Sequence, residues 1–518
     1  MSTQITEFLE QGALEVGVRG LPGPAGTPGA AGASGPPGVG IIDLRDEGYA
    51  VDVPGVEAEE VPPTLSDAAA NMAALNAAVA TLRANANGES TIFAPAGVGR
   101  IQPAGGIGWR FQNLGGFTIS AGGANLGQGN TPDDSSWHNV NNAADNFFVG
   151  SELFAIGFGA AAVIDLFDVA SVRIAGLTIR GDGADPAAIG IRIGKLVGGL
   201  GPSTIHGVQG KIHNCDVGID VGVVGADGGG FVASNCSEIF LEQWAFSRCP
   251  IAYLVHHNQS LNHYLAQCQF SEVGDCVWQL DGGNIVVDQP VLIDSERLIT
   301  VSQGGSATGV IQVRGARIDG NAHRTKLFHA DLDGELVFAS FLGGTTSTGN
   351  RDAGNEARCT VGSAHFVYVC DWINLVRTDA TGPAFEFTGA GRKGMMLERC
   401  RLPSSSPHFP DLKKIIGNVD ATGWWWIRDC QADGTLGGSH EGKRLADVEY
   451  PRINEGASTH RFHIFDHCTS PGLMGMTAGA SGAGAAVGRV AGGKQHPGVR
   501  RMQTGTTATG VAWIATEI

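Results

Sequence analysis

The chain has 518 residues, 79 of them glycine, with 16% charged residues and a formal net charge of −17 at pH 7. This negative charge disfavours nucleic acid and anionic membrane surfaces as partners. No run of 18 apolar residues is present, so we expect no transmembrane helix. Abundant glycine together with Val, Ile and Phe predicts short strands and tight turns, and therefore an all-β fold.

The first segment, residues 1–16, contains the apolar residues Ile5, Phe8, Leu9 and Leu14. It is too short to fold alone, so it is either a docking peptide or a frayed terminus. Residues 1–10 lack the basic region and apolar core of a signal peptide, so we expect synthesis and retention in the cytosol. We assign residues 1–16 as an N-terminal docking peptide.

Residues 17–38 carry glycine at every third position, namely at 17, 20, 23, 26, 29, 32, 35 and 38, with five prolines between them. An unbroken G-x-y run is the signature of the collagen triple helix, because only glycine fits at the crowded axis of three chains. A flexible linker would not keep eight glycines in phase. We therefore predict a collagen-like shaft over residues 17–40 and a parallel homotrimer with threefold symmetry.

The next segment, residues 41–101, begins with an acidic passage and then predicts one α-helix. Ser66 and Asp67 provide a cap and a favourable charge at its start, and alanine dominates through Ala84. The apolar stripe follows three-four-three spacing and consists of Met72, Leu75, Val79 and Leu82. A short strand ending in Pro95-Ala96-Gly97 comes after the helix.

A helix, a glycine turn and a short strand ending in Pro-Ala-Gly resemble the N-terminal part of the pectate-lyase-like right-handed β-helix. This family includes bacteriophage tailspikes and pectin-degrading enzymes. The resemblance implies that the helix closes one end of a β-helix. The family's Asp-Phe-Gly-Ala phrase is replaced here by Asp43-Leu44-Arg45-Asp46.

Residues 102–477 repeat a loose theme, in which a short apolar strand meets a polar residue followed by Cys or Gly. Irregular steps of about one solenoid coil separate the cysteines, and stacked coils would bring the polar-Cys pair back to the same corner. We predict a right-handed parallel β-helix here. A β-sandwich is the alternative, although it would not favour a recurring corner signature. All ten cysteines are expected to be reduced, buried thiols.

The last segment, residues 478–518, begins with a Gly/Ala-rich hinge over residues 478–493. Residues 496–510 resemble a phrase that opens C-terminal receptor-binding domains of phage fibres. The eight residues after them are too few for a separate core. This segment therefore either adds strands across the trimer or is the stub of a longer product.

Together these resemblances imply a virion protein, a phage tail fibre or tailspike that binds a bacterial surface glycan or receptor during host adsorption. Its N-terminus would bind a tail or baseplate protein, and the protein would be made in the cytoplasm of the bacterial host. Two alternatives remain open: a polysaccharide depolymerase on the same scaffold, acting as a glycosidase or lyase, and a structural spacer. The sequence contains no zinc-binding or phosphate-loop motif, so we expect no metal and no cofactor.

Depolymerase chemistry needs two carboxylates at a fixed separation. The tightest acidic cluster is Asp331, Asp333 and Glu335, which would project from one face of a strand. Asp294 with Glu296 and Glu238 with Glu242 form further pairs. Acidic residues are also common at solvent-exposed positions of a solenoid, so each group has a non-catalytic explanation. We favour glycan binding over catalysis as the function.

The string from Gly423 to Ile427 contains three consecutive tryptophans. If Trp425 and Ile427 point inward, then Trp424 and Trp426 share the outer face. Exposed indoles stack on sugar rings, but they also fill subunit interfaces. Trp424 and Trp426 are the candidate glycan-binding residues, with burial against a neighbouring subunit as the alternative.

Overall fold

A computed structural model defines the fold over most of the middle of the chain. The described residues are 40–52, 66–85, 90–122, 150–182, 188–197, 199–224, 236–257, 260–280, 283–302, 309–320, 325–330, 337–347, 359–362, 365–373, 375, 385–387, 393–401, 416–417, 423–429, 444–449, 461–466, 473–477, 486–491 and 512–515. All belong to one of two compact units, the one spanning residues 39–518. The predicted docking peptide and collagen-like run lie outside them, so those predictions and the domain boundaries stay predictions.

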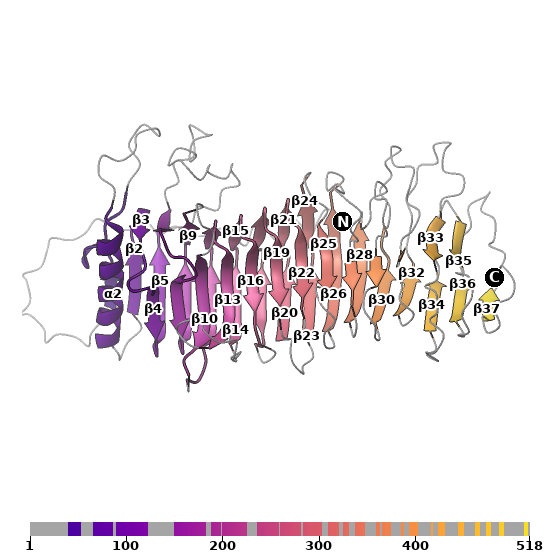
Figure 1. Cartoon of the computed structure of the whole chain (residues 1–518), viewed down its shortest axis with the longest axis horizontal. Helices are drawn as coiled ribbons and strands as arrows, with labels where there is room; N and C mark the ends of the chain where they lie inside the picture. Colours follow the sequence, from indigo (N-terminus) through magenta and orange to yellow (C-terminus); the bar gives the residue numbers. More distant parts are fainter. Residues whose placement is uncertain are drawn as a thin grey trace, which may run out of the picture. The chain divides into compact units, whose positions relative to one another are not determined.

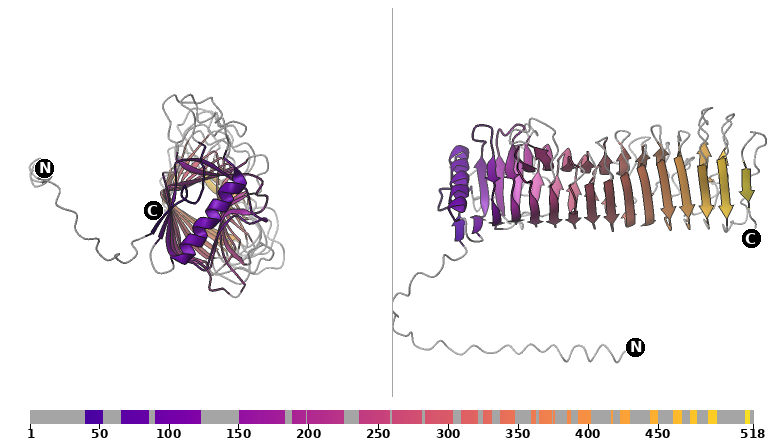
Figure 2. Two further views of the ribbon diagram at one scale, coloured as in Figure 1. Left: turned by 90° about the vertical axis from the view of Figure 1, so that its left-hand side faces the viewer. Right: turned by 90° about the horizontal axis from the view of Figure 1, so that it is seen from below.

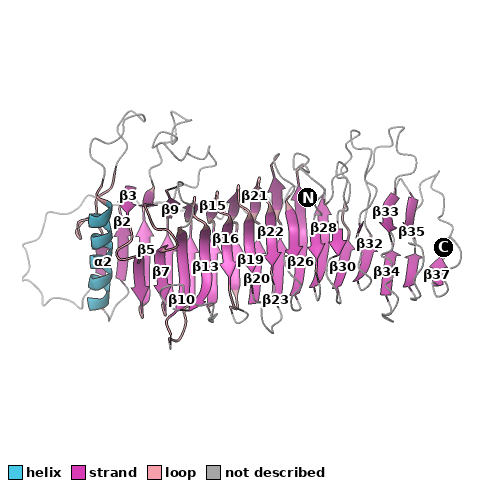
Figure 3. Ribbon diagram, viewed as in Figure 1, coloured by secondary structure: helices cyan, strands magenta, loops and turns pink. Residues whose placement is uncertain are grey.

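Within this unit, strands succeed one another around a coil, and each strand pairs with its counterpart one coil further along the chain (Figure 1). Every pairing between named strands is parallel. A coil contributes one strand to each of three faces, which we number in chain order. Strands dominate the described residues, with a single helix at one end (Figure 3).

Face 1 consists of β1 (Gly40–Asp43), β2 (Ser90–Ala94), β5 (Gly115–Ala121), β8 (Ala170–Ala175), β11 (Ser203–Val208), β14 (Ser237–Glu242), β17 (His263–Ala266), β20 (Gly283–Asp288), β23 (Gly309–Arg314), β26 (Val337–Thr346), β28 (His365–Ile373), β30 (Lys393–Glu398), β32 (Gly423–Arg428), β34 (Arg461–Asp466), β36 (Ala486–Ala491) and β37 (Ala512–Ala515).

Face 2 consists of β3 (Gly97–Ile101), β6 (Ser151–Ala155), β9 (Leu177–Gly181), β12 (Lys211–His213), β15 (Ala245–Ser247), β18 (Gln269–Ser271), β21 (Val291–Ile293) and β24 (Arg317–Asp319). Faces 1 and 2 count as one 24-stranded sheet because β26 continues through the corner and also pairs with β24.

Face 3 is an 11-stranded sheet of β4 (Trp109–Gln112), β7 (Ala162–Phe167), β10 (Ile189–Lys195), β13 (Val217–Val224), β16 (Ile251–Val255), β19 (Asp275–Gln279), β22 (Arg297–Val301), β25 (Lys326–Ala330), β27 (Cys359–Val361), β29 (Phe385–Phe387) and β31 (Ile416–Gly417). A separate two-stranded sheet pairs β33 (Arg444–Glu449) with β35 (Leu473–Thr477).

This arrangement is a right-handed parallel β-helix, as the sequence predicts. The β-sandwich alternative is wrong, because sandwich sheets are antiparallel and these pairings are parallel. Inward side chains stack coil upon coil, and the buried core runs through all three faces. Where a large side chain enters the stack, glycine makes room: a Cβ on Gly207 or Gly210 would come within 2.6 Å of the buried Trp244 indole.

The helix α2 (Ala68–Ala84) lies across one end of the coil stack, as Figure 2 shows in the view along the coils. Its predicted stripe of Met72, Leu75, Val79 and Leu82 is buried against the first coils. In addition, the Trp109 indole donates a hydrogen bond of 2.9 Å to the carbonyl oxygen of Leu75. The helix therefore covers apolar side chains that the first coil would otherwise expose to water.

One detail of the helix start differs from the sequence expectation. Asp67, not Ser66, is the N-cap, because its carboxylate accepts hydrogen bonds from the backbone N–H groups of Ala69 and Ala70. Ser66 is occupied elsewhere: its hydroxyl accepts a bond from the backbone N–H of Arg100.

The corner between faces 1 and 2 holds residues with positive φ, which L-amino acids adopt at a cost. Gln209, Gln243, Gln267 and Gln289 occupy it in successive coils, with φ between 51° and 56°. Each backbone N–H bonds to the carbonyl oxygen of the next coil. The side-chain amides of the first three also bond to one another, at 3.0 and 3.2 Å. These bonds between coils offset the strain of the corner.

Four of the described cysteines directly follow a residue with positive φ, which gives the polar-Cys signature its physical basis. Cys215 and Cys249 lie at the corner between faces 2 and 3, whereas Cys268 and Cys400 lie at the corner between faces 1 and 2. The expectation of one shared corner is therefore wrong. The eight described cysteines are buried thiols that form no disulfide bond with one another, namely Cys215, Cys236, Cys249, Cys268, Cys276, Cys359, Cys370 and Cys400.

Over the described residues, no helix is both long and apolar enough to cross a membrane. Within the same ranges, no group of three His, Cys, Asp or Glu side chains is arranged to hold a metal ion.

Candidate functional site

The outer surface of face 1 carries a row of exposed apolar side chains. Val310 in β23, Phe338 in β26 and Phe366 in β28 pair in register one coil apart. Val310 and Phe338 are 44% and 45% exposed, and Phe366 is partly exposed. The two phenylalanine rings stack with centroids 5.3 Å apart and planes 18° apart. We call these three residues the aromatic row.

The backbone register extends this row toward the predicted tryptophans. Phe366 pairs with Gly394 in β30, and Gly394 pairs with Trp424 in β32. Trp426 pairs with Met396, which pairs with Tyr368. The strand positions of Trp424 and Trp426 therefore continue the outer rows of face 1. The contacts of their side chains lie outside the described part of the structure, so their role stays a prediction.

Beside the aromatic row, tyrosines bond to carboxylates one coil away. The Tyr264 hydroxyl donates to Asp288 at 2.8 Å, and the Tyr368 hydroxyl donates to Glu398 at 2.6 Å. The bond to Asp288 raises the pKa of Tyr264, and burial together with the bonds to Cys370 and Glu398 raises the pKa of Tyr368. Both tyrosines therefore remain protonated at neutral pH and act as donors.

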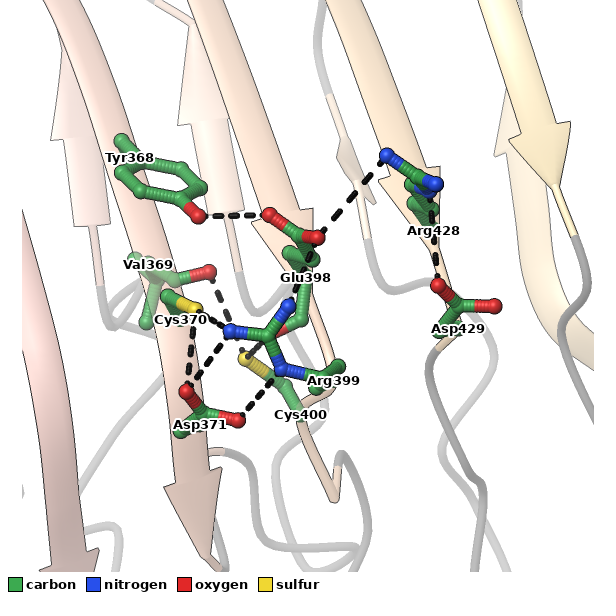
Figure 4. A network of polar contacts seen from close by, with 9 residues as sticks. All are labelled: Tyr368, Val369, Cys370, Asp371, Glu398, Arg399, Cys400, Arg428 and Asp429. Carbon is green, nitrogen blue, oxygen red and sulfur yellow. Dashed lines mark hydrogen bonds and ion pairs between the residues drawn. The ribbon is translucent and has the colours of Figure 1, made fainter.

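Figure 4 shows how the second pair extends into a network across β28, β30 and β32. Arg399 follows β30 and binds Asp371 through two bonds, from Nε to Oδ1 at 2.7 Å and from Nη2 to Oδ2 at 2.8 Å. Its Nη1 lies 2.8 Å from Glu398. Arg428, in the next coil, lies 3.9 Å from the same carboxylate. Arg428 also lies 3.4 Å from Asp429, so two arginines face three carboxylates on this surface.

These ion pairs limit the chemistry that the network can perform. The bond from Arg399 lowers the pKa of Asp371, so that carboxyl group stays ionised at neutral pH. A general acid in glycoside hydrolysis needs the opposite, a carboxyl group whose pKa is raised. Carboxylates, guanidinium groups and phenols beside exposed aromatic rings are instead suited to binding, because rings stack on apolar surfaces while polar groups fix orientation.

Of the predicted acidic groups, Asp331, Asp333 and Glu335 lie outside the described residues and stay a prediction. Asp294 and Glu296 lie in the turn between β21 and β22, on either side of the buried Ser295. They are therefore not an i, i+2 pair on one strand, which corrects the geometry assumed from the sequence.

The third predicted pair, Glu238 and Glu242, does lie within one strand, β14 on face 1, and both side chains are exposed. Glu238 has a φ of 61° and accepts a hydrogen bond of 2.7 Å from the Thr204 hydroxyl. This bond assigns Glu238 a part in the contact between coils.

Sequence reasoning missed a row of largely buried charges on face 3. Arg110, Asp165, Arg192 and Asp220 follow one another in register through β4, β7, β10 and β13. Asp165 lies 2.9 Å from Arg110, and Asp220 lies 2.6 Å from Nε2 of His256. Burial raises the pKa of Asp165. The sequence signal for this row is one charged residue inside each apolar strand, with the sign of the charge alternating from one coil to the next.

Neither a protein-family model nor a curated protein sequence matches the chain. Solved structures do match. A tailspike protein double mutant of E. coli bacteriophage HK620 has a TM-score of 0.53 and 12% identity over 89% of this chain and 78% of that chain. A single mutant of the same tailspike in complex with a pentasaccharide has a TM-score of 0.52 and 12% identity over 88% of this chain and 80% of that chain.

The chain has the parallel β-helix fold of phage tailspikes. At 12% identity this similarity establishes the shared architecture. It leaves the activity to be argued from the residues of this chain.

Proposed function

We propose that this protein is a virion component, a phage tail fibre or tailspike, that binds a bacterial surface glycan during host adsorption. The observation that carries the proposal is the aromatic row of Val310, Phe338 and Phe366 beside the Tyr264–Asp288 and Tyr368–Glu398 pairs. Exposed rings offer stacking surfaces to sugar rings, and the flanking polar groups offer donors and acceptors to hydroxyl groups. The tailspike fold and a tailspike relative in complex with a pentasaccharide support it.

The collagen-like run supports a further part of the proposal, a homotrimer whose N-terminal peptide binds a tail or baseplate protein. Aromatic rows also occur at subunit interfaces, so the row must be tested for glycan binding directly. Cleavage of the glycan remains the alternative, resting on Asp331, Asp333 and Glu335. Release of reducing ends from a bound polysaccharide by the wild-type protein would establish it.

The test of binding compares two variants with matched exposure. Phe338→Ala removes a ring from the aromatic row, and Ile373→Ala removes a side chain of 48% exposure at the far end of the neighbouring strand β28. A panel of immobilised bacterial lipopolysaccharides and capsular polysaccharides identifies the ligand of the wild-type protein. Its affinity is then measured for both variants by surface plasmon resonance, and the oligomeric state by native mass spectrometry.

We expect Phe338→Ala to weaken binding about 5- to 30-fold, which corresponds to roughly 1–2 kcal/mol for a truncated contact residue. Ile373→Ala should bind like the wild type. Equal binding by both variants would refute the assignment to the aromatic row. Loss of the oligomer in Phe338→Ala would show that the row is a subunit interface.

A further inference from the structure

A second polar cluster lies on face 2, away from the aromatic row. Glu152 in β6, Thr178 in β9 and Lys211 in β12 pair in register, one coil apart. A neighbouring row runs through Arg180 in β9, His213 in β12 and Ser247 in β15. Lys211 and His213 are two residues apart on one strand and therefore share a face.

His213 is buried with half of its hydrogen-bonding capacity unused. Its side chain is 3% exposed, and Nδ1 lies 2.7 Å from the Ser247 hydroxyl. Its Nε2 is buried and has no hydrogen-bond partner in the structure. Burial lowers the pKa of His213 to about 3, so the ring is neutral at neutral pH. A neutral imidazole can still donate one N–H from Nε2 to an acceptor.

Lys211 is the second cation of this cluster, and the negative charge of Glu152 acts on it. It is partly buried, burial lowers its pKa, and it makes no hydrogen bond or ion pair with the described part of the chain. The nearby carboxylate of Glu152 is bonded instead to Arg180, at 2.6 Å. The Arg180 guanidinium also lies 4.2 Å from the centre of the Phe154 ring. Arg180 and Glu152 thus bond to each other, and the cluster of two cations and one carboxylate keeps a net positive charge.

A partly buried ammonium group without an acceptor costs free energy. The cost is recovered when an anionic oxygen binds, because bonds between charged groups are the strong ones. The side chains of Arg180 and Glu152 keep 16% and 20% exposure, so solvent reaches the edge of the cluster. The chain as a whole carries a formal charge of −17, which repels anions at long range. An anion would therefore bind only where a local positive charge, such as that of Lys211, outweighs this repulsion.

We propose that Lys211 and Nε2 of His213 form a binding site for an anionic oxygen group, the carboxylate of an acidic sugar in the recognised glycan. The identity of the ligand rests on the proposed glycan-binding function. The same chemistry would also take a free anion such as phosphate, and the experiment separates the two sources.

The experiment is a calorimetric titration of the full-length protein with three probes: tetragalacturonic acid, its methyl ester and inorganic phosphate. The wild type should bind the acid and bind the ester more weakly, because esterification removes the charge and keeps the sugar. Lys211→Met keeps the length of the side chain and should weaken binding of the acid about 10- to 100-fold, the usual loss for a charged hydrogen bond. Lys195→Met, at the end of β10, is the matched control and should bind like the wild type.

Thermal unfolding of the same variants separates a binding role from a structural one. If Lys211 serves to bind a ligand, Lys211→Met should keep or raise the melting temperature of the unliganded protein, because it removes an amine that has no hydrogen-bond acceptor. A lower melting temperature in Lys211→Met with unchanged binding of the acid would overturn the proposal. So would a wild-type protein that binds neither the acid nor phosphate.

The phosphate arm decides between the two sources. Phosphate bound as tightly as the tetramer, and lost in Lys211→Met, would overturn the acidic-sugar assignment in favour of a free anion. A failed anion site leaves the proposed function intact if Phe338→Ala still weakens binding to the bacterial polysaccharide. If the wild type binds no polysaccharide from the panel, the proposed function fails separately.

Discussion

The buried amide of Asn71 connects the capping helix to the β-helix, and its removal gives a prediction with a calculable size. Asn71 is 1% exposed. Its Nδ2 donates to the carbonyl oxygens of Ala50 at 2.8 Å and Arg100 at 2.9 Å, and its Oδ1 accepts from the N–H of Ala50 at 2.8 Å. Asn71→Ala leaves three backbone groups without these partners. The helix α2 should then detach more readily from the first coils.

The expected loss follows from the cost of leaving buried polar groups unpaired. Even about 1 kcal/mol for each group, the low end of the usual range, gives roughly 3 kcal/mol. Alanine returns about 0.5 kcal/mol because it favours the helix more than asparagine does. Asn76→Ala, on the exposed side of the same helix, gains the same propensity without losing these bonds. The difference between the two variants therefore isolates the buried amide.

Native-state hydrogen exchange of the α2 amides is the appropriate assay. Coils of a solenoid contact only their neighbours, so the cap can open without unfolding the whole β-helix. A net loss of about 2.5 kcal/mol corresponds to roughly 70-fold faster exchange in Asn71→Ala. Exchange in Asn76→Ala should match or fall below that of the wild type. Equal exchange rates in the two variants would refute the role assigned to Asn71.

Two further predictions concern buried side chains. Thiol labelling of the unfolded chain should find ten free cysteines, whereas the eight described ones should resist labelling in the native protein; fewer than ten after unfolding would indicate disulfides. Burial lowers the pKa of His213 to about 3 and that of His263 to about 4. Since the unfolded chain takes up these protons near pH 6.5, stability is complete above that pH and falls as the pH drops, by about 2 kcal/mol for each histidine at pH 5. Denaturant unfolding from pH 7.5 to 4.5 should therefore show that the free energy of unfolding falls less with pH in His263→Gln than in the wild type. The same dependence on pH in both proteins would contradict this.

The helix and its buried stripe were predictable because the determining contacts lie within a few residues of each other. Met72, Leu75 and Val79 occur at helical spacing, and alanine favours the helix. The identity of the cap was not predictable. Ser66 is engaged by the backbone of Arg100, which is 34 residues away and becomes its neighbour only when the first coil closes.

The β-helix was predictable from the recurring short strands and polar-Cys pairs, although these pairs lie at two corners and not one, but the candidate site was not predictable. Gln209, Gln243 and Gln267 bond to one another in successive coils, but they recur at unequal steps in the sequence because the coils differ in length. The sequence alone therefore does not reveal that they are neighbours. Val310 and Phe338 likewise fall one coil apart, with two other strands between them. Only the register shows that they meet on one surface. Trp424 and Trp426 could be assigned to one face from the sequence because they lie on the same strand. Sequence periodicity shows which residues of one strand share a face, but not which strands lie side by side.

The architecture also determines how binding and cleavage would respond to mutation. Each coil places one residue in the aromatic row, so removing Phe338 leaves Val310 and Phe366 in place, and binding should decline by a limited factor. Cleavage depends instead on two carboxylates at one separation, and loss of either removes the reaction. On face 1, Arg399 keeps the carboxylate of Asp371 ionised. An ionised carboxylate accepts hydrogen bonds from sugar hydroxyl groups but cannot donate a proton. A graded response across the row, without release of reducing ends, is therefore the behaviour that this surface favours.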